Sequence, residues 1–443
     1  MELSAGTQMI VLFLIFVLLR VPVAFSLALS AMYAMYQMDF GLEMVGDLIV
    51  VGIAKYSLLA IPFFILAGKL MGVTGIAGKM INFFRVLLGS LPGRMGVVGT
   101  VVCLFWGAVS GSGPASVAAI GPLIIRGMVA DGYSRPFAAG LVCAGAALSL
   151  IIPPSIGLVI YGVIAQTSIS NLFLAAVIPG VMLGCLMLCA LPFAKLSTLA
   201  DAAPTPAGQE AIDLHGRFDT DTSLSYGKRL ARAFNDAAWG LLTPVVILGG
   251  IYGGIFTPTE AAIVATVYAM FVGFVVYRSL SLKGLFACVV DSASSTAVVM
   301  LVVAFASLFG WVVVVDGLVS TYSDALLGIS DSTWAIVLVM MFILLLTGMF
   351  MDAITVMLIT LPIFLPVIDR LGLDPIWFGV ASMTALSIGL ITPPVGINLF
   401  VAANITQLPL GKVAMGALPF LLTSLLGLLA IIYIPGVSLF FFR

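Results

Sequence analysis

Stretch after stretch of 15 to 25 residues in this chain is dominated by Leu, Val, Ile, Phe and Met. Each stretch is long enough to cross about 30 Å of hydrocarbon at a rise of about 1.5 Å per residue. The whole chain shares the bias, because 62% of its 443 residues are hydrophobic and 8% are charged. We therefore expect an all-α polytopic membrane protein, and the composition excludes a water-soluble enzyme.

Charge and motif content narrow the function further. The chain has 18 Lys and Arg against 19 Asp and Glu, so it has no basic field for nucleic acid. Its single histidine, His215, lies in a polar loop, and no nucleophile with a neighbouring base is visible, so we expect no enzyme activity. No phosphate-binding GxxxxGK[ST] loop is present, which leaves an ion gradient as the energy source. The expected partners are the lipid bilayer, other subunits and a small solute.

Ten apolar segments predict membrane spans, and two further apolar regions are interrupted midway by Gly, Ser, Asp or Pro. The interrupted regions, near 95–130 and 333–370, each predict a re-entrant hairpin of two half-length helices that enters the membrane and turns back. The predicted spans lie near 7–19, 22–38, 48–67, 136–165, 171–193, 237–255, 259–277, 285–315, 375–405 and 410–435.

One long polar stretch, residues 195–236, separates the fifth span from the sixth. Its composition predicts a surface connector. Basic residues mark both of its ends, and by the positive-inside rule they place the connector in the cytoplasm. These residues are Lys195, Lys228, Arg229 and Arg232.

Prolines recur at a spacing of 240 positions. Pro122 and Pro362, the pairs Pro153-Pro154 and Pro393-Pro394, and Pro179 and Pro419 all follow this spacing in order. The pattern predicts two copies of one unit, residues 1–194 and 237–443. Five spans, an odd number, separate the two hairpins, so the second copy is expected to be inverted relative to the first. The broken helices would then lie near 136–165 and 375–405.

Four interruptions at membrane depth carry the candidate chemistry: two hairpin tips and two Pro-Pro breaks. A Pro-Pro pair removes two N–H donors and frees carbonyl groups where no water satisfies them. Freed carbonyls and hydroxyls suit a small cation, and helix N-termini attract an anion. The duplication therefore predicts two pseudo-symmetric cation sites beside one solute site.

Each of these polar residues also has a structural interpretation, which the sequence leaves open. A Pro-Pro break can be a kink whose freed groups are satisfied by neighbouring helices. Asp352 can be the N-cap of the returning half-helix, and Ser110, Ser112 and Ser155 can be caps as well. Asn398 can hydrogen-bond between helices.

In combination, four segments resemble the large membrane subunit of a TRAP (tripartite ATP-independent periplasmic) transporter: Trp106-Gly-Ala-Val-Ser-Gly-Ser-Gly-Pro-Ala-Ser, Gly253-Gly-Ile-Phe-Thr-Pro-Thr-Glu-Ala-Ala, Gly348-Met-Phe-Met-Asp and Ile391-Thr-Pro-Pro-Val-Gly-Ile-Asn. The resemblance implies sodium-coupled import of a carboxylated solute across the bacterial inner membrane. It also implies a separate small four-helix membrane subunit, a periplasmic substrate-binding protein, and an elevator mechanism in which a transport domain moves against a scaffold.

By position, the resemblance also assigns site residues. A first sodium site would be lined by Ser110, Gly111, Ser112, Pro154 and Ser155. A second would be lined by Gly348, Asp352, Thr392, Pro394 and Gly396. The solute would lie near Ser112, Ser155 and Asn398.

Two other transport classes remain open. A stand-alone sodium-coupled anion transporter of related architecture would need no binding protein, and an ion channel would conduct without saturation. The sequence also leaves open whether the solute is a sialic acid, a C4-dicarboxylate, a keto acid or a sugar acid.

Overall fold

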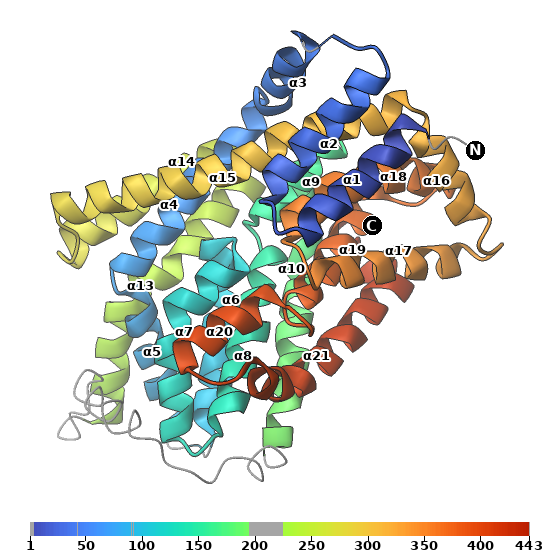
Figure 1. Cartoon of the computed structure of the whole chain (residues 1–443). Coiled ribbons are helices and arrows are strands. Elements are labelled where there is room, and N and C mark those ends of the chain that lie inside the picture. The colour runs from blue at the N-terminus through green and yellow to red at the C-terminus, as the bar shows by residue number, and fades with distance from the viewer. Residues whose placement is uncertain (1–3, 42, 90, 92, 195–224, 443) are drawn as a thin grey trace.

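The computed structural model describes residues 4–41, 43–89, 91, 93–194 and 225–442, and every regular element in these ranges is a helix (Figure 1). Eight of the helices in this part of the chain are long and apolar enough to cross a membrane. The expectation of an all-helical, multi-pass membrane protein is confirmed. Most of connector 195–236 lies outside the described residues.

The helices before the connector begin with three that precede a short 3₁₀ turn, and seven follow it. They are α1 (Ala5–Leu18), α2 (Val23–Gln37), α3 (Glu43–Ile53), the turn η1 (Tyr56–Leu59), α4 (Ala60–Val73), α5 (Ile76–Leu87), α6 (Arg94–Ser110), α7 (Gly113–Ala130), α8 (Arg135–Ala147), α9 (Ile156–Ile164) and α10 (Ile169–Ala190).

The helices after the connector include the longest in the described chain, α15. They are α13 (Tyr226–Tyr252), α14 (Pro258–Phe271), α15 (Leu282–Val315), α16 (Leu318–Leu327), α17 (Thr333–Gly348), α18 (Ala353–Arg370), α19 (Pro375–Gly389), α20 (Ile397–Thr406) and α21 (Leu410–Tyr433).

The helix bounds of the two halves follow the proline spacing. Adding 240 to the bounds of α7, residues 113 and 130, gives 353 and 370, which are the bounds of α18. Likewise, α8 begins at 135 and α19 at 375. Each half thus contains a helix pair in contact, then a helix interrupted at Pro-Pro, then a long helix, in the same order.

Two predicted boundaries are wrong. The span expected at 48–67 is two helices, because α3 ends at Ile53 and the chain turns through Lys55 into η1 and α4. Residues 226–236, assigned to the connector, form the first turns of α13. These turns are amphipathic: Ala233 and Ala237 are buried against α5, so polar composition alone misassigned a helix that packs by one face.

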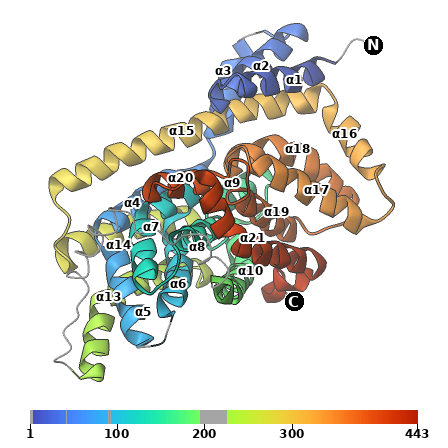
Figure 2. The same cartoon turned by 60° about the horizontal axis from the view of Figure 1, so that its bottom comes forward.

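In each half, the second segment of the broken helix packs against helices of the other half. The second segment of the first broken helix, α9, contacts α18 and α19, and the corresponding α20 contacts α7 and α8. The long helix α15 crosses the molecule, with α1, α2 and α3 on its far side from these interleaved helices (Figure 2). The contacts of α9 and α20 with the opposite half bring the four interruptions into one region.

A close glycine contact joins the two halves. Gly140 of α8 faces Gly416 of α21, where a Cβ on Gly416 would lie 2.0 Å from the Pro136 carbonyl oxygen. Only a residue without a side chain permits backbones to approach this closely. The contact fixes the helix before the first break against the helix after the second.

Candidate solute site at the helix breaks

The tip of the first helix pair is a two-residue turn. Helix α6 ends at Ser110, Gly111 has a φ of +61°, and α7 begins at Gly113. The Ser112 carbonyl accepts hydrogen bonds from the Ser110 hydroxyl at 3.3 Å and the Ser116 hydroxyl at 2.7 Å. The hydroxyls thus organise the tip around one carbonyl oxygen.

The first Pro-Pro break lies against this tip. Ser155 follows Pro154 and is the N-cap of α9, because its hydroxyl oxygen accepts from the Leu158 N–H at 3.4 Å. The same hydroxyl donates to the Leu150 carbonyl at 2.6 Å, across the break. A Cβ on Gly111 would lie 3.4 Å from the Ile156 nitrogen, so tip and break are in contact.

The tip of the second pair is built around a carboxylate. Asp352 is the N-cap of α18: one of its oxygens accepts from the Ile354 and Thr355 N–H groups, each at 3.1 Å. Its other oxygen accepts from the Thr355 hydroxyl. The structure thus shows the capping role that the sequence left open.

The second Pro-Pro break lies against the second tip. The Gly396 N–H donates to the Met349 carbonyl at 3.0 Å, and Gly348 packs against α19. Before Pro394, the Thr392 hydroxyl donates to the Ile388 carbonyl of its own helix at 2.6 Å. Each tip therefore contacts the break of its own half.

Asn398 links the second break to the first half. Its side chain is fully buried, and its amide nitrogen donates to the Cys143 carbonyl at 3.0 Å. Its amide oxygen has no hydrogen-bond partner among the described residues and lies near the α7 start, where a Cβ on Gly113 would be 2.9 Å away. Asn398 is thus a contact between helices of the two halves.

One cavity of about 740 Å³ collects the starts of four helices. The first residues of α7, α9, α18 and α20 all line it: Gly113, Ile156, Ala353 and Ile397. The predicted residues Ser110, Gly111, Ser112 and Asp352 line it as well. The predicted residues that are not in the lining are Pro154, Ser155, Gly348, Thr392, Pro394, Gly396 and Asn398.

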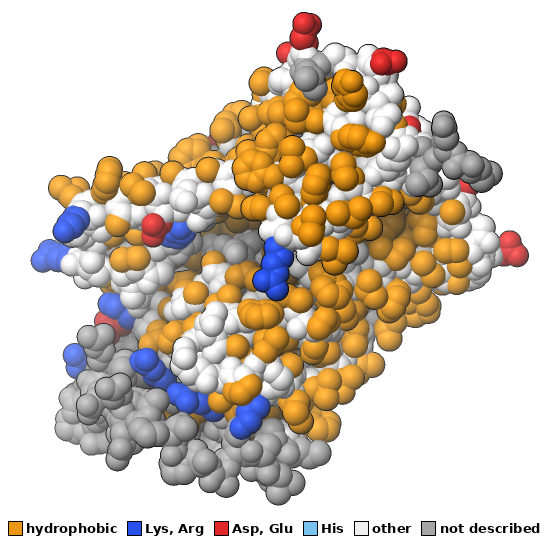
Figure 3. Space-filling view, in the orientation of Figure 1, with side chains coloured by type: hydrophobic (Ala, Val, Ile, Leu, Met, Phe, Trp, Pro, Cys, Tyr) orange, Lys and Arg blue, Asp and Glu red, His pale blue; other side chains and the backbone are white. Residues whose placement is uncertain are grey.

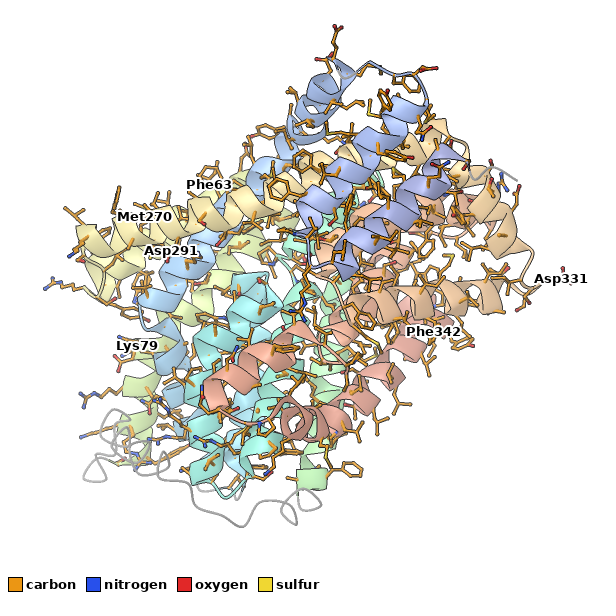
Figure 4. The ribbon with its side chains drawn as sticks, viewed as in Figure 1. Phe63, Lys79, Met270, Asp291, Asp331 and Phe342 are labelled. Carbon is orange, nitrogen blue, oxygen red and sulfur yellow. The ribbon has the colours of Figure 1, made fainter. Side chains whose placement is uncertain are left out.

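The sequence did not predict the wall of the cavity that lies opposite the helix starts. It consists of α4 and α15, where the Lys69 ammonium donates to the Asp291 carbonyl at 2.6 Å and to the Ser295 hydroxyl at 2.9 Å. Figure 4 labels Asp291 on α15, and α4 and α15 are in contact. The run Asp291-Ser-Ala-Ser-Ser-Thr, inside an otherwise apolar span, was the available signal.

The electrostatics of the cavity favour a small anion next to cations. A helix N-terminus carries roughly half a positive charge, and the first residues of four helices line this space. At α18, the Asp352 carboxylate already caps this end. Hydroxyl and carbonyl oxygens at the tips, together with Asp352, are the hard ligands that an alkali cation prefers. Among the described residues, no group of three or more His, Cys, Asp or Glu side chains could hold a metal ion.

The far end of the first helix pair is closed by polar contacts outside the candidate spans. Asp131 accepts from the Met95 N–H at 3.0 Å, and the Tyr133 hydroxyl donates to the Gly93 carbonyl at 2.8 Å. Burial, and then the charge of Asp131, raise the pKa of the Tyr133 phenol. The phenol therefore keeps the proton with which it ties the start of α6 to the end of α7.

Comparison with known proteins identifies the family. Residues 10–437 match the family described as "Tripartite ATP-independent periplasmic transporter, DctM component". A C4-dicarboxylate TRAP transporter large permease protein of Pseudomonas aeruginosa is 39% identical over 87% of this chain and 86% of its own length. A sialic acid TRAP transporter large permease protein of Vibrio cholerae is 35% identical over 94% of each.

An isethionate TRAP transporter permease protein of Oleidesulfovibrio alaskensis is 37% identical over 97% of this chain, which spans 65% of that protein. Among solved structures, the YdaH transporter of Alcanivorax borkumensis has a similar fold, with a TM-score of 0.61 at 16% identity over 97% of this chain and 98% of that one. The Neisseria gonorrhoeae efflux pump MtrF has a TM-score of 0.60 at 14% identity, over 98% and 95%. By the family match and these relatives, the chain belongs to the large permease subunits of TRAP transporters.

Proposed function

We propose that this chain imports a carboxylated organic solute across the bacterial inner membrane, coupled to sodium entry. A periplasmic binding protein would deliver the solute, and a small four-helix membrane subunit would complete the permease. The observation that carries the proposal is the convergence of four helix starts on one cavity of about 740 Å³, because this arrangement favours an anion.

We place the coupling ions at the two tip-and-break pairs. The first sodium ion would be held at Ser110, Gly111, Ser112, Pro154 and Ser155. The second would be held at Gly348, Asp352, Thr392, Pro394 and Gly396. In support, each tip contacts the break of its own half. Residues of both groups lie behind or beside the cavity wall, where bound sodium would add positive charge near the solute.

The helix order supports an inverted repeat with an elevator mechanism. The equal spacing of helix bounds in the two halves is what the duplication 1–194 and 237–443 requires. The two hairpins and two broken helices pack on one another and would move as one transport domain against α4 and α15. The cavity lies between these two bodies, as a site exposed alternately to each side must.

Surface charge supports a cytoplasmic connector. In Figure 3, most of the visible Lys and Arg side chains gather at the lower left, and the visible acidic groups lie mainly at the top and right. The basic residues Lys79 and Lys228 belong to α5 and α13, the helices that flank the connector side of the molecule. By the positive-inside rule, this end faces the cytoplasm.

Reconstitution tests the proposal. The chain and its small subunit in proteoliposomes should take up a carboxylate only with an inward sodium gradient and the loaded binding protein. Each monovalent ion entering down 100 mV contributes about 2.3 kcal/mol, so an imposed potential should raise uptake if more sodium charge enters than solute charge.

The two alternative functions, a stand-alone transporter and an ion channel, predict different results in the same vesicles. Full uptake without the binding protein would identify a stand-alone transporter. Current that does not saturate with solute concentration would identify a channel. Uptake at the same rate with and without sodium would overturn the proposed sodium coupling.

A further inference from the structure

We propose that the solute is a monocarboxylate with an apolar body, whose carboxylate is bound by Lys69 and the indole N–H of Trp106. This inference rests on the proposed function and narrows its substrate class. Relatives named for a C4-dicarboxylate and for sialic acid transport solutes with two carboxylates or many hydroxyls. The walls of this cavity are unsuited to a second carboxylate and to a solute with many hydroxyl groups.

Lys69 supplies the positive charge. It is the one Lys or Arg among the residues that line the cavity. Its ammonium donates to two neutral oxygens, the Asp291 carbonyl and the Ser295 hydroxyl, which hold it at the wall. An ammonium has three N–H donors, so one remains for a solute oxygen. A lysine within an apolar helix is costly in a membrane, and a bound carboxylate would offset that cost.

Trp106 supplies the second donor. Its side chain is 1% exposed, it belongs to the cavity wall, and its indole nitrogen has no hydrogen-bond partner among the described residues. A buried N–H without a partner is unfavourable. The proposal requires the indole to turn this N–H toward the cavity, where a carboxylate oxygen would satisfy it.

The two donors belong to adjacent helices. Next to Lys69, a Cβ on Gly68 would lie 3.3 Å from the Ser110 Cα, so α4 touches α6 at this level. Trp106 precedes Ser110 by four residues, which places it one helical turn away on the same face of α6. One carboxylate can therefore lie between the wall of α4 and the wall of α6.

The other lining groups disfavour a second carboxylate. Asp291 and Asp352 both line the cavity, and Lys69 is the single cationic side chain among the lining residues. The proposed sodium ion would offset the charge of Asp352 but not that of Asp291. A second negative charge on the solute would therefore lie near Asp291 without a second cationic side chain to pair with.

The remaining wall is largely aliphatic. It includes Ile65, Ala115, Ala118, Val298, Val302 and Leu390. Hydroxyl groups of a sugar acid would lose their water here and find few partners, which costs free energy for each unpaired group. A branched aliphatic or aromatic body would bury its surface instead.

Binding measurements on the full chain in lipid nanodiscs test the substrate class. The probes are 2-oxoisocaproate as an apolar monocarboxylate, succinate as a dicarboxylate and gluconate as a polyhydroxy acid, each in sodium chloride and in choline chloride. We expect 2-oxoisocaproate to bind at least tenfold more tightly than either other acid in sodium. Equal or tighter binding of succinate or gluconate would overturn this inference alone. Failure of all three acids to bind in sodium would also overturn this inference, whereas the proposed function is overturned separately, by uptake in the reconstituted system that does not depend on sodium.

Variants test the two donors. Lys69→Met keeps the length of the side chain and removes the charge, and should weaken 2-oxoisocaproate binding at least tenfold, whereas Lys69→Arg should restore most of it. Trp106→Phe keeps a ring and should weaken binding severalfold with an unchanged melting temperature. The matched control is Lys79→Met, which removes an ammonium 3.5 Å above the Tyr277 ring and outside the cavity lining. Wild-type affinity in both Lys69→Met and Trp106→Phe would overturn the proposal.

Discussion

At the scale of single residues, one side chain at the second tip combines two roles that mutation can separate. Asp352 caps α18 through two backbone N–H groups, and it also faces the cavity. Asparagine caps a helix about as well as aspartate but has no charge. Alanine has no charge and is also a poor cap. The two substitutions therefore report on different properties of the same position.

Asp352→Asn should keep the free energy of unfolding within a few tenths of a kcal/mol, and Asp352→Ala should lower it by about 0.5–2 kcal/mol. Both should raise the sodium concentration needed for half-maximal uptake, because both remove the carboxylate proposed to contact the ion. Thermal unfolding and sodium-activation curves measure the two effects.

Asp374 provides the control, because it caps α19 with the same pattern, accepting from the Ile376 N–H at 2.7 Å and the Trp377 N–H at 3.2 Å, and it does not line the cavity. Asp374→Asn should leave sodium activation unchanged. If Asp352→Asn also leaves it unchanged, the carboxylate is only a cap.

At the scale of elements, the contact between α8 and α21 holds the breaks of the two halves in register. A Cβ on Gly416 would lie 2.0 Å from the Pro136 carbonyl oxygen, and a Cβ on Gly140 would lie 2.3 Å from the Gly416 oxygen. Gly416→Ala must therefore push the helices apart. We expect it to destabilise the protein by about 1–3 kcal/mol, as overpacking does.

Gly411 on the same helix is the matched control, because a Cβ there meets nothing within 4 Å. Gly411→Ala should be neutral or slightly stabilising, since alanine favours the helix by up to about 1 kcal/mol. Chemical or thermal unfolding in detergent compares the two. Equal stabilities would show that α8 and α21 are not pressed together as the structure has them.

At the scale of the whole molecule, the proposed elevator requires α4 to slide along the hairpin tip. Gly68 of α4 lies against Ser110, so cysteines at these two positions should form a disulfide in the conformation described. Cross-linking Gly68→Cys to Ser110→Cys should stop uptake, and reduction should restore the activity that the uncross-linked double variant has. The background should lack the exposed Cys185 and Cys189.

A cross-link within one body is the control for this experiment. Gly52 of α3 lies against Ser307 of α15, where a Cβ on Gly52 would be 2.5 Å from the Ser307 Cβ. Joining Gly52→Cys to Ser307→Cys should leave uptake intact, because neither helix belongs to the proposed transport domain. Normal uptake with a complete Gly68–Ser110 cross-link would argue against the sliding motion.

The sequence by itself determined the membrane class, the order of the helices and the position of the four interruptions. Hydrophobic length and proline spacing are local properties, and they persist whatever the chain packs against. For the same reason, the local pattern Thr257-Pro-Thr-Glu260 forms a capping box at the start of α14. Local signals failed at Lys55 and at residues 226–236, where packing decided the helix bounds.

Only the tertiary structure decided which interruptions meet and what faces them. The exchange of α9 and α20 between the halves brings Asn398 to Cys143, which is 255 positions away. The tertiary structure also places Lys69 and Trp106 on a cavity wall, and the sequence assigned neither residue to the site. Such contacts depend on the packing of distant helices, and no spacing along the chain encodes them.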